Sequence, residues 1–442
     1  MLAACGGGGS NQPPVTPSPT PTPGPTPTPT PTPAAVTVTY PHIFGIAVSD
    51  GGQPNGPLLQ ASDGNFYGTT RAGGNNRCND LDNFCGAIFR LTPSGDEAVL
   101  YSFGASMSDA YRPSGPLIQG RDGALYGLTA NGGTHGAGTA FKITLNGAFT
   151  ILYSFGASPS DGIVPIGGLT QGSDGDFYGA TASGGANHCG QIPQSGSNCG
   201  TVFKISPSGV ETVLYSFGAS RSDGVTPNGS LVQGGDGNFY GTTVNGGANA
   251  CSDSGATNNC GTVFRITPAG VLSVLYSFGA SRADSIAPQG ALIQGRDGAF
   301  YGTTASGGGG QCGFSFGCGT VFRMTSAGNV TILYAFAAIS RSDGYGPSPF
   351  LIQARDGNFY GTTGSGGANA SDLNGTVFRL TPSGVKTTLY SFGPLNTNPS
   401  NPVGGVIEAT DGAFYGVTAY NGALGAVGNR MGTGAVFKLV VR

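Results

Sequence analysis

Apolar positions of the chain cluster in short runs, and the runs recur in sets of four. One set contains "SLVQG", "NFYGTT", "GTVFRIT" and "VLYSF", which are rich in β-branched and aromatic residues. Gly, Pro and Asp-Gly pairs separate the runs, as turns separate strands. "DGNFYGTT" or a variant begins at Asp63, Asp122, Asp174, Asp236, Asp297, Asp356 and Asp411. The pattern predicts an all-β protein of seven similar units, with strands A, B, C and D in chain order in each unit.

The spacing of the runs shows where the units differ. From the Phe of strand C to the Phe of strand D the interval is 14 residues in each complete copy, as from Phe89 to Phe103. The interval from the Tyr of strand B to the Phe of strand C instead varies from 15 to 25 residues. The sequence therefore predicts a constant frame with one variable connection, the B–C loop.

The two ends of the repeat region are complementary. The last copy stops after strand C, "GAVFKLVVR", and the folded region begins with an unmatched strand D, "VTVTYPHIFG". A linear solenoid would need polar caps instead of matching leftovers. We therefore predict a seven-bladed β-propeller with four-stranded blades, closed by an N-terminal strand that completes the last blade. A β-solenoid and two stacked β domains are the alternatives.

Composition narrows the functional classes. Of 442 residues, 82 are Gly and only 9% are charged, and the formal net charge is −3. So much Gly disfavours helical folds, and the lack of a basic surplus argues against a nucleic-acid partner. No run of about 18 apolar residues is present, so we expect contact with a membrane only through a lipid anchor.

The first residues suggest export. Leu2-Ala3-Ala4-Cys5 resembles the bacterial lipobox, in which Cys5 would become the lipidated first residue, although four residues are too few for a complete signal peptide before it. We predict a lipobox-like start with a Gly/Ser segment over 1–12, a Thr/Pro-rich tether in polyproline II over 13–35, and the propeller over 36–442. A disordered tail without an anchor is the alternative.

The combined pattern of "DGNFYGTT", "GTVFRIT" and "VLYSF" resembles the GloVer tandem repeat of Gloeobacter- and Verrucomicrobia-type bacteria. The resemblance covers about Tyr40 to Arg442 and all seven copies. It implies an exported, anchored surface protein of otherwise undefined biochemistry. It supplies no catalytic residues to carry over.

Eight further cysteines occur in pairs within the B–C loops. The second member directly precedes the Gly that opens strand C, and copies 2, 6 and 7 lack both members. Paired gain and loss is typical of disulfides and implies an oxidising compartment. Zinc would need four convergent ligands, and only His188 is nearby. The predicted disulfides are Cys78–Cys85, Cys189–Cys199, Cys251–Cys260 and Cys312–Cys318, with no metal ion and no cofactor.

Two polar residues also recur once per copy. The first follows strand D, as Asp50, Asp109, Asp161, Asp223, Asp284 and Asp343. These carboxylates could form a binding ring for Ca²⁺ or a polycation, or each could close an Asx-type turn. The second lies in strand A, as Gln60, Gln119, Gln171, Gln233, Gln294 and Gln353, with Glu408 in the last copy. We expect the amides to bond blade to blade, and we single out Glu408 as a lone carboxylate near the channel.

These features favour a binding protein over an enzyme. Glu occurs only at 97, 211 and 408, the three His are scattered, and no nucleophile elbow, P-loop or HExxH is present. The B–C loops are rich in Asn, Ser and Gly, which supply adaptable hydrogen bonds, and they should share the face opposite the short turns and the tether. We predict a non-catalytic, extracytoplasmic monomer, lipid-anchored at the outer membrane or cell surface, that binds a protein or polysaccharide. A propeller hydrolase or lyase acting on polysaccharide and a structural envelope protein are the alternatives.

Overall fold

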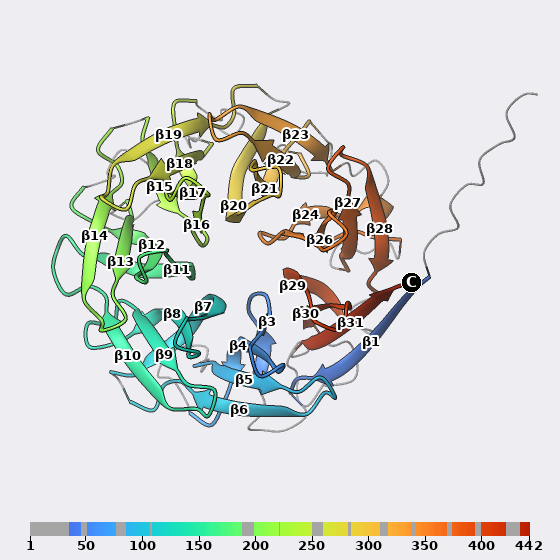
Figure 1. The fold of residues 1–442 in the computed structure, drawn as a ribbon, viewed down its shortest axis with the longest axis horizontal. Helices are drawn as coiled ribbons and strands as arrows, with labels where there is room; N and C mark the ends of the chain where they lie inside the picture. Colours follow the sequence, from blue (N-terminus) through green and yellow to red (C-terminus); the bar gives the residue numbers. More distant parts are fainter. Residues whose placement is uncertain are drawn as a thin grey trace, which may run out of the picture. The chain divides into compact units, whose positions relative to one another are not determined.

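A computed structural model describes residues 35–45, 51–76, 85–106, 108–187, 199–220, 222–249, 260–281, 284–309, 317–336, 341–368, 374–393, 399–420 and 434–442. Within these ranges the compact unit Val36–Arg442 forms seven antiparallel sheets around a central axis (Figure 1). The described part of the chain contains no helix long and apolar enough to cross a bilayer. The architecture is the predicted seven-bladed β-propeller.

The strands of each blade run outward from the axis in the order A, B, C, D (Figure 1). Blade 1 contains β2 (Gly51–Pro54), β3 (Leu59–Gln60), β4 (Phe66–Gly73), β5 (Ala87–Leu91) and β6 (Glu97–Ser102). Blade 2 contains β7 (Ala110–Gln119), β8 (Leu125–Gly132), β9 (Thr139–Ile143) and β10 (Phe149–Ser154). Blade 3 contains β11 (Gly162–Gln171), β12 (Phe177–Gly184), β13 (Thr201–Ile205) and β14 (Glu211–Ser216). Blade 4 contains β15 (Gly224–Pro227), β16 (Val232–Gln233), β17 (Phe239–Gly246), β18 (Thr262–Ile266) and β19 (Leu272–Ser277).

The remaining three blades repeat this order. Blade 5 contains β20 (Ser285–Gln294), β21 (Phe300–Gly307), β22 (Thr320–Met324) and β23 (Val330–Ala335). Blade 6 follows the short 3₁₀ turn η1 (Arg341–Asp343) and contains β24 (Tyr345–Pro347), β25 (Ile352–Gln353), β26 (Phe359–Ser365), β27 (Thr376–Leu380) and β28 (Lys386–Ser391). Blade 7 contains β29 (Ser400–Glu408), β30 (Phe414–Tyr420), β31 (Ala435–Val441) and β1 (Val36–Ile43).

Blade 7 joins the two ends of the folded region. Its sheet has the order β1-β31-β30-β29, and β1 pairs antiparallel with β31 from Val36–Val441 to Ile43–Ala435. The first strand and the last strand lie side by side in Figure 1, in blue and dark red. The N-terminal strand therefore completes the last blade, as predicted, and the open solenoid alternative is wrong.

Strand A differs from its sequence-based prediction. It starts directly after the repeated Asp, so that β7 begins at Ala110 and is ten residues long. "SLVQG" and its equivalents cover only the last part of this strand, which in blades 1, 4 and 6 is divided into two short strands. Pro and Gly in the middle of the segment argued against a strand. An innermost position, where backbones of neighbouring blades approach closely, explains why they are tolerated there.

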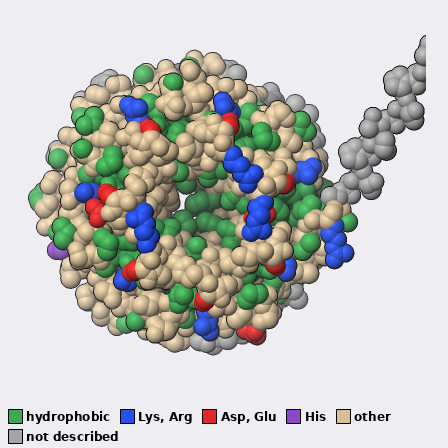
Figure 2. All heavy atoms as spheres, viewed as in Figure 1, with side chains coloured by type: hydrophobic (Ala, Val, Ile, Leu, Met, Phe, Trp, Pro, Cys, Tyr) green, Lys and Arg blue, Asp and Glu red, His purple; other side chains and the backbone are tan. Residues whose placement is uncertain are grey.

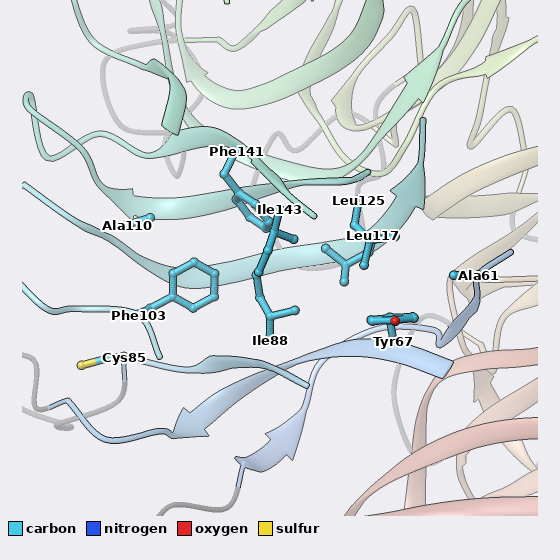
Figure 3. Close-up of a cluster of buried hydrophobic side chains, with 10 residues drawn as sticks. All are labelled: Ala61, Tyr67, Cys85, Ile88, Phe103, Ala110, Leu117, Leu125, Phe141 and Ile143. Carbon is cyan, nitrogen blue, oxygen red and sulfur yellow. The ribbon is translucent and has the colours of Figure 1, made fainter. Parts of the chain in front are cut away.

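The repeated "FYG" explains how the blades pack. The Tyr of one blade stacks on the Phe of the next, as in Tyr178 on Phe239, with ring centroids 3.8 Å apart. The Gly leaves room for the Phe of strand C, because a Cβ at Gly68 would lie 2.6 Å from Cζ of Phe89. Apolar side chains therefore fill the space between facing sheets, as Figure 3 shows for the cluster between blades 1 and 2. Removing this area from water is the main source of stability for such a core.

Candidate functional site

The strand register gives the ring two distinct faces. In blade 2, Gln119 pairs with Leu125, Leu125 pairs with Ile143, and Ile143 pairs with Phe149. The A–B and C–D turns therefore lie at the same edge of the sheet, and the B–C connection lies at the other edge. We call these edges the short-turn face and the loop face.

The Asp of each Asp-Gly turn is part of the framework of the short-turn face. Oδ2 of Asp63 accepts a hydrogen bond from the Tyr67 hydroxyl at 2.7 Å, and Oδ1 accepts from the N–H of Asn65. The same Tyr–Asp bond occurs as Tyr126–Asp122, Tyr178–Asp174, Tyr240–Asp236, Tyr301–Asp297, Tyr360–Asp356 and Tyr415–Asp411. The turn that opens the repeat is thus tied to the strand that follows it in all seven blades.

Basic residues after the Phe of strand C complete this framework. The ion pairs are Lys142–Asp122 at 2.7 Å, Lys204–Asp176 at 3.3 Å, Arg323–Asp297 at 2.8 Å and Lys438–Asp411 at 2.9 Å. Partial burial acts to raise the pKa of Asp122, but hydrogen bonds from Lys142 and Tyr126 outweigh it and leave that pKa below its usual value. These four cations therefore belong to the frame of the short-turn face.

The Asp that follows strand D lies in the interior. Asp161 is 4% exposed, and its Oδ2 accepts from the Tyr153 hydroxyl and from the N–H groups of Gly156 and Ala157 at 2.7 to 2.9 Å. Equivalent Tyr–Asp bonds are Tyr101–Asp109, Tyr215–Asp223, Tyr276–Asp284 and Tyr334–Asp343. Asp50 lies outside the described residues.

This burial decides between the two interpretations of the Asp ring. A ring that binds Ca²⁺ or a polycation would need several carboxylates converging on one solvent-accessible point. Asp109, Asp161, Asp223 and Asp284 instead each close the separate turn that connects one blade to the next, and they are between 4% and 9% exposed. Within the described ranges, no three His, Cys, Asp or Glu side chains gather where they could hold a metal ion. The turn interpretation therefore holds for these four residues.

The glutamines of strand A join the blades into a closed circle. Oε1 of Gln119 in blade 2 accepts from the N–H of Ser62 in blade 1 at 2.9 Å, while Nε2 donates to the carbonyl of Gly123 in its own turn. The same acceptor contact occurs at Arg121–Gln171, Ser173–Gln233, Gly235–Gln294, Arg296–Gln353, Arg355–Glu408 and Thr410–Gln60. The last contact spans 350 residues of sequence and closes the circle. The predicted blade-to-blade role of these amides is confirmed.

Glu408 takes the place of a glutamine in this circle. Its Oε2 accepts from the N–H of Arg355 at 2.8 Å, and its Oε1 lies 3.8 Å from Nη1 of the same residue. A carboxylate has no N–H to donate to the carbonyl of its own turn, as the glutamines do. Glu408 therefore keeps the contact between blades 6 and 7 and adds an ion pair to it.

Both ends of the B–C loops are held by hydrogen bonds to neighbouring strands. In blade 3, the side-chain amide of Asn187 donates to the carbonyl of Ser216 at 2.8 Å. At the far end, the carbonyl of Cys199 accepts from the N–H of Thr226 in the next blade at 3.0 Å. Residues 188–198 between these ends lie outside the described residues. The loop is thus rooted in rigid structure on either side.

The second cysteine of each predicted disulfide is buried at the start of strand C. The exposed fractions are 0% for Cys85 and Cys199, 3% for Cys260 and 2% for Cys318. Their predicted partners Cys78, Cys189, Cys251 and Cys312, and also Cys5, lie outside the described residues. The disulfide pairing and the lipidation therefore remain predictions.

Sequence reasoning missed a repeated contact in strand A. Six residues that precede a Pro have φ between 52° and 57°: Gln53, Arg112, Val164, Thr226, Ala287 and Asn401. This region is unfavourable for a β-branched residue such as Val164. The N–H of Val164 donates to the carbonyl of Ala137 in the preceding blade at 2.9 Å, which offsets the strain. The recurring Pro-x-Gly in the copies was the signal for this inter-blade contact.

One solved structure of low sequence identity shares the fold, and others are less similar. The extracellular domain of a protein described as a hybrid two component system from B. thetaiotaomicron is 12% identical, with a TM-score of 0.54, and the match covers 92% of this chain and 41% of that one. A protein of unknown function from Dyadobacter fermentans is 10% identical, with a TM-score of 0.47 and coverage of 92% and 99%. A protein described as an oxidoreductase (glucose dehydrogenase) from Thermus thermophilus is 15% identical, with a TM-score of 0.42 and coverage of 92% and 100%. At 12% identity, the first of these structures shows the fold alone.

The family assignment comes from sequence. No curated protein sequence matches the chain. The pattern described as the Gloeobacter/Verrucomicrobia repeat matches residues 30–253, 193–316 and 250–441, which together include all seven blades. The seven copies, with their Asp-Gly turns and their closing strand, are therefore repeats of this type, and the chain belongs to the Gloeobacter/Verrucomicrobia repeat family.

Proposed function

We propose that this protein is an exported, lipid-anchored binding module that recognises a protein or a polysaccharide through the B–C loops of its loop face, without catalysis. The observation that carries the proposal is how the frame uses its repeated polar residues. The turn aspartates, the strand-A glutamines and the strand-C cations contact other parts of the ring. Variation between copies is left to the B–C loops.

The blade with the shortest loop shows what the frame itself requires. In blade 2 the connection closes in a compact turn, in which the N–H of Gly136 donates to Gly133 at 3.1 Å and the N–H of Gly138 donates to Gly132 at 3.0 Å. Blade 3 keeps the same pairing of strands B and C with an interval ten residues longer. The additional residues are not needed for the fold, and loops on a rigid scaffold commonly carry recognition.

The distribution of reactive side chains supports binding over catalysis. A catalytic site needs several distinct groups in one place. The three glutamates, Glu97, Glu211 and Glu408, belong to blades 1, 3 and 7, and His42 and His135 belong to blades 7 and 2. A polysaccharide hydrolase or lyase would need two such groups to converge on one substrate.

Export and anchoring rest on the N-terminal sequence and on the paired cysteines. Lipid on Cys5 and a Thr/Pro-rich tether would hold the ring at the outer membrane or cell surface. Non-reducing peptide mapping of the exported protein should find each predicted disulfide within its own loop. Pairing between loops, or eight free thiols, would contradict an oxidising compartment.

The binding proposal is tested by exchanging loops. In one variant, Ala182–Cys199 and Val244–Cys260 are replaced by Ala130–Ala137, the short connection of blade 2. Binding of the full chain to separated polysaccharide and protein fractions of the producing cell's envelope is compared with that of the variant. We expect the variant to fold and to bind its fraction at least tenfold more weakly. Equal binding by a folded variant would show that the loop face is not the recognition surface.

A further inference from the structure

Three arginines occupy one repeated position on the short-turn face. The residue before the Asp of the Asp-Gly turn is Arg121 in blade 2, Arg296 in blade 5 and Arg355 in blade 6, whereas the other blades have Ser, Gly or Thr there. All three side chains are exposed, Arg355 by 60%. Because strand A is the innermost strand, its turns border the central hollow, and Figure 2 shows Lys and Arg side chains around that hollow.

Two of these guanidinium groups rest on the next blade in the same way. Arg296 donates from Nη1 to the carbonyl of Arg355 at 3.1 Å and from Nη2 to that of Ala354 at 2.9 Å. Arg121 makes the matching pair of contacts with Ser173 and Gly172 at 3.3 and 3.0 Å. A guanidinium has five N–H donors, so these contacts hold the group in place and leave donors for a ligand. An arginine held in this way loses little freedom on binding.

The order of the blades places the arginines on opposite sides of the hollow. Blades 5 and 6 are neighbours, so Arg296 and Arg355 lie close together, and Nη2 of Arg355 reaches the carbonyl of Ala409 in blade 7 at 3.3 Å. In a ring of seven, blade 2 lies across from blades 5 and 6 (Figure 1). A ligand in the hollow would therefore meet Arg121 on one side and two further arginines on the other.

Three arginines line the inner rim of a protein that is acidic overall. Farther from the axis, the cations of strand C pair with aspartates of their own blades, as Lys142 does with Asp122. Beside the rim arginines the structure shows one ion pair, between Arg355 and Glu408 at 3.8 Å. Three arginines and one glutamate, Glu408, therefore stand at the inner ends of the blades, although the chain as a whole carries −3.

We propose that this inner rim is a second binding site, which takes an acidic oligosaccharide whose carboxylates accept hydrogen bonds from Arg121, Arg296 and Arg355. A carboxylate matches the planar fork of an arginine. Several carboxylates on one chain could reach both sides of the hollow together. Three arginines are too few for the many phosphate contacts of a nucleic acid. The site lies on the face opposite the B–C loops and does not depend on their function.

The test uses the full chain and a fluorescently labelled oligogalacturonate, with affinity measured by fluorescence anisotropy at low and moderate salt. The triple variant Arg121→Gln, Arg296→Gln and Arg355→Gln should bind at least tenfold more weakly, with a flatter salt dependence. Glutamine keeps an amide donor for the neighbouring blade. The control Arg71→Gln removes an exposed arginine from β4 and should leave affinity unchanged.

A gain-of-function variant keeps the proposal testable if the triple variant folds poorly. Gly235 holds the same position in blade 4, outside the positive-φ residues, and a Cβ there would meet only Oε1 of Gln294 at 3.9 Å. Gly235→Arg should fold and bind the oligogalacturonate severalfold more tightly. Wild-type protein that does not bind it, or binding that neither change alters, would overturn the proposal. Arginine-dependent binding of polyphosphate without binding of oligogalacturonate would overturn its assignment to a carboxylated glycan.

Discussion

Two of the interfaces between neighbouring blades, which we call seams, contain the same Tyr–Asp hydrogen bond but differ in the residue that lies beside it. Between blades 2 and 3, Asp161 accepts from Tyr153 at 2.9 Å, and the first residue of β14 is Glu211. Between blades 5 and 6, Asp343 accepts from Tyr334 at 2.8 Å, and the first residue of β28 is Lys386. Glu211 and Lys386 hold the same register, since they pair with Ile205 and Leu380 at the ends of their C strands. One repeated position thus places opposite charges beside the carboxylate of the turn, which is 4% exposed at Asp161 and whose side chain is 17% exposed at Asp343.

The lysine satisfies the carboxylate and the glutamate does not. Nζ of Lys386 donates to Oδ1 of Asp343 at 2.6 Å, and its side chain is only 3% exposed. Oε1 of Glu211 and Oδ1 of Asp161 are buried without a hydrogen-bond partner within the described residues. Burial, and then the charge of Asp161, raises the pKa of Glu211 to about 7. Burial lowers the pKa of Lys386, against the opposing effect of Asp343.

The comparison of the two seams separates the contact that every seam keeps from the residue that differs between seams without changing the fold. The Tyr–Asp bond is kept at both seams, and it is also kept between blades 1 and 2, where Phe149 stacks on Tyr101 with centroids 3.9 Å apart. The third residue of each seam, which is the first residue of the D strand beside the Tyr–Asp pair, can therefore be acidic, basic or aromatic. We infer that the Tyr–Asp pair defines the seam and that the third residue adjusts its stability and pH dependence.

The largest effect should come from opening the ring, because every seam depends on its closure. Deleting Val36–Gly45 removes β1 and also Phe44, which is fully buried against Phe89 with centroids 5.1 Å apart. We expect the unfolding free energy to fall by at least about 3–5 kcal/mol from loss of the Phe44 side chain alone. We also expect aggregation through the exposed edge of β31. Thermal unfolding and light scattering measure both. A truncated chain that melts like the full chain would mean that β1 does not hold the ring closed.

The next effect should come from removing the lysine at the satisfied seam. Lys386→Met leaves the mostly buried carboxylate of Asp343, whose side chain is 17% exposed, without its cation, which should cost about 3 kcal/mol of unfolding free energy at neutral pH. Lys204→Met is the control, because that ion pair at 3.3 Å is about one-third exposed and should contribute about 0–1 kcal/mol. Urea denaturation of both variants makes the comparison. Equal losses would show that burial does not distinguish the two lysines.

A smaller effect, of opposite sign, is expected at the unsatisfied seam. The pKa of Glu211 in the folded protein, about 7, lies above its ordinary value of 4.5. Its contribution to stability is therefore fully present below about pH 4.5 and is lost as the pH rises through 7. Glu211→Gln should stabilise the protein at pH 8 by roughly 1–2 kcal/mol, allowing for partial exposure, and should change little at pH 4.5. If the unfolding free energy of the variant changed between pH 4.5 and pH 8 as much as that of the wild type, Glu211 would not be the source of the pH dependence.

Repeat spacing was enough to predict the number of blades, their closure and the variable loop. These features follow from the number of strands in each copy and from the intervals between them. In a closed ring, the unmatched strand Val36–Ile43 could pair only with the last strand C. The circle of glutamines was also predictable, because a buried amide repeated once per blade needs a neighbour.

The other contacts between blades were not predictable, because they depend on how the sheets are staggered. Asp161 and Glu211 are fifty residues apart in different copies, and nothing in their spacing indicates that the D strand of one blade faces the turn of the one before. Burial likewise decided the role of the Asp ring, for which the sequence alone favoured a turn and left a cation site as the alternative. The first half of strand A was missed because its Pro and Gly disfavour strands in general.

The most direct test of the account converts one seam into the other. In Glu211→Lys, a lysine faces Asp161 as Lys386 faces Asp343, in an otherwise unchanged full chain. The measurement is the unfolding free energy of wild type and variant by urea denaturation at several pH values from 4.5 to 8. The account predicts that the variant is more stable at pH 8 and no longer loses stability as the pH rises through 7. A variant that is less stable at pH 8, or that keeps the wild-type pH dependence, would contradict it.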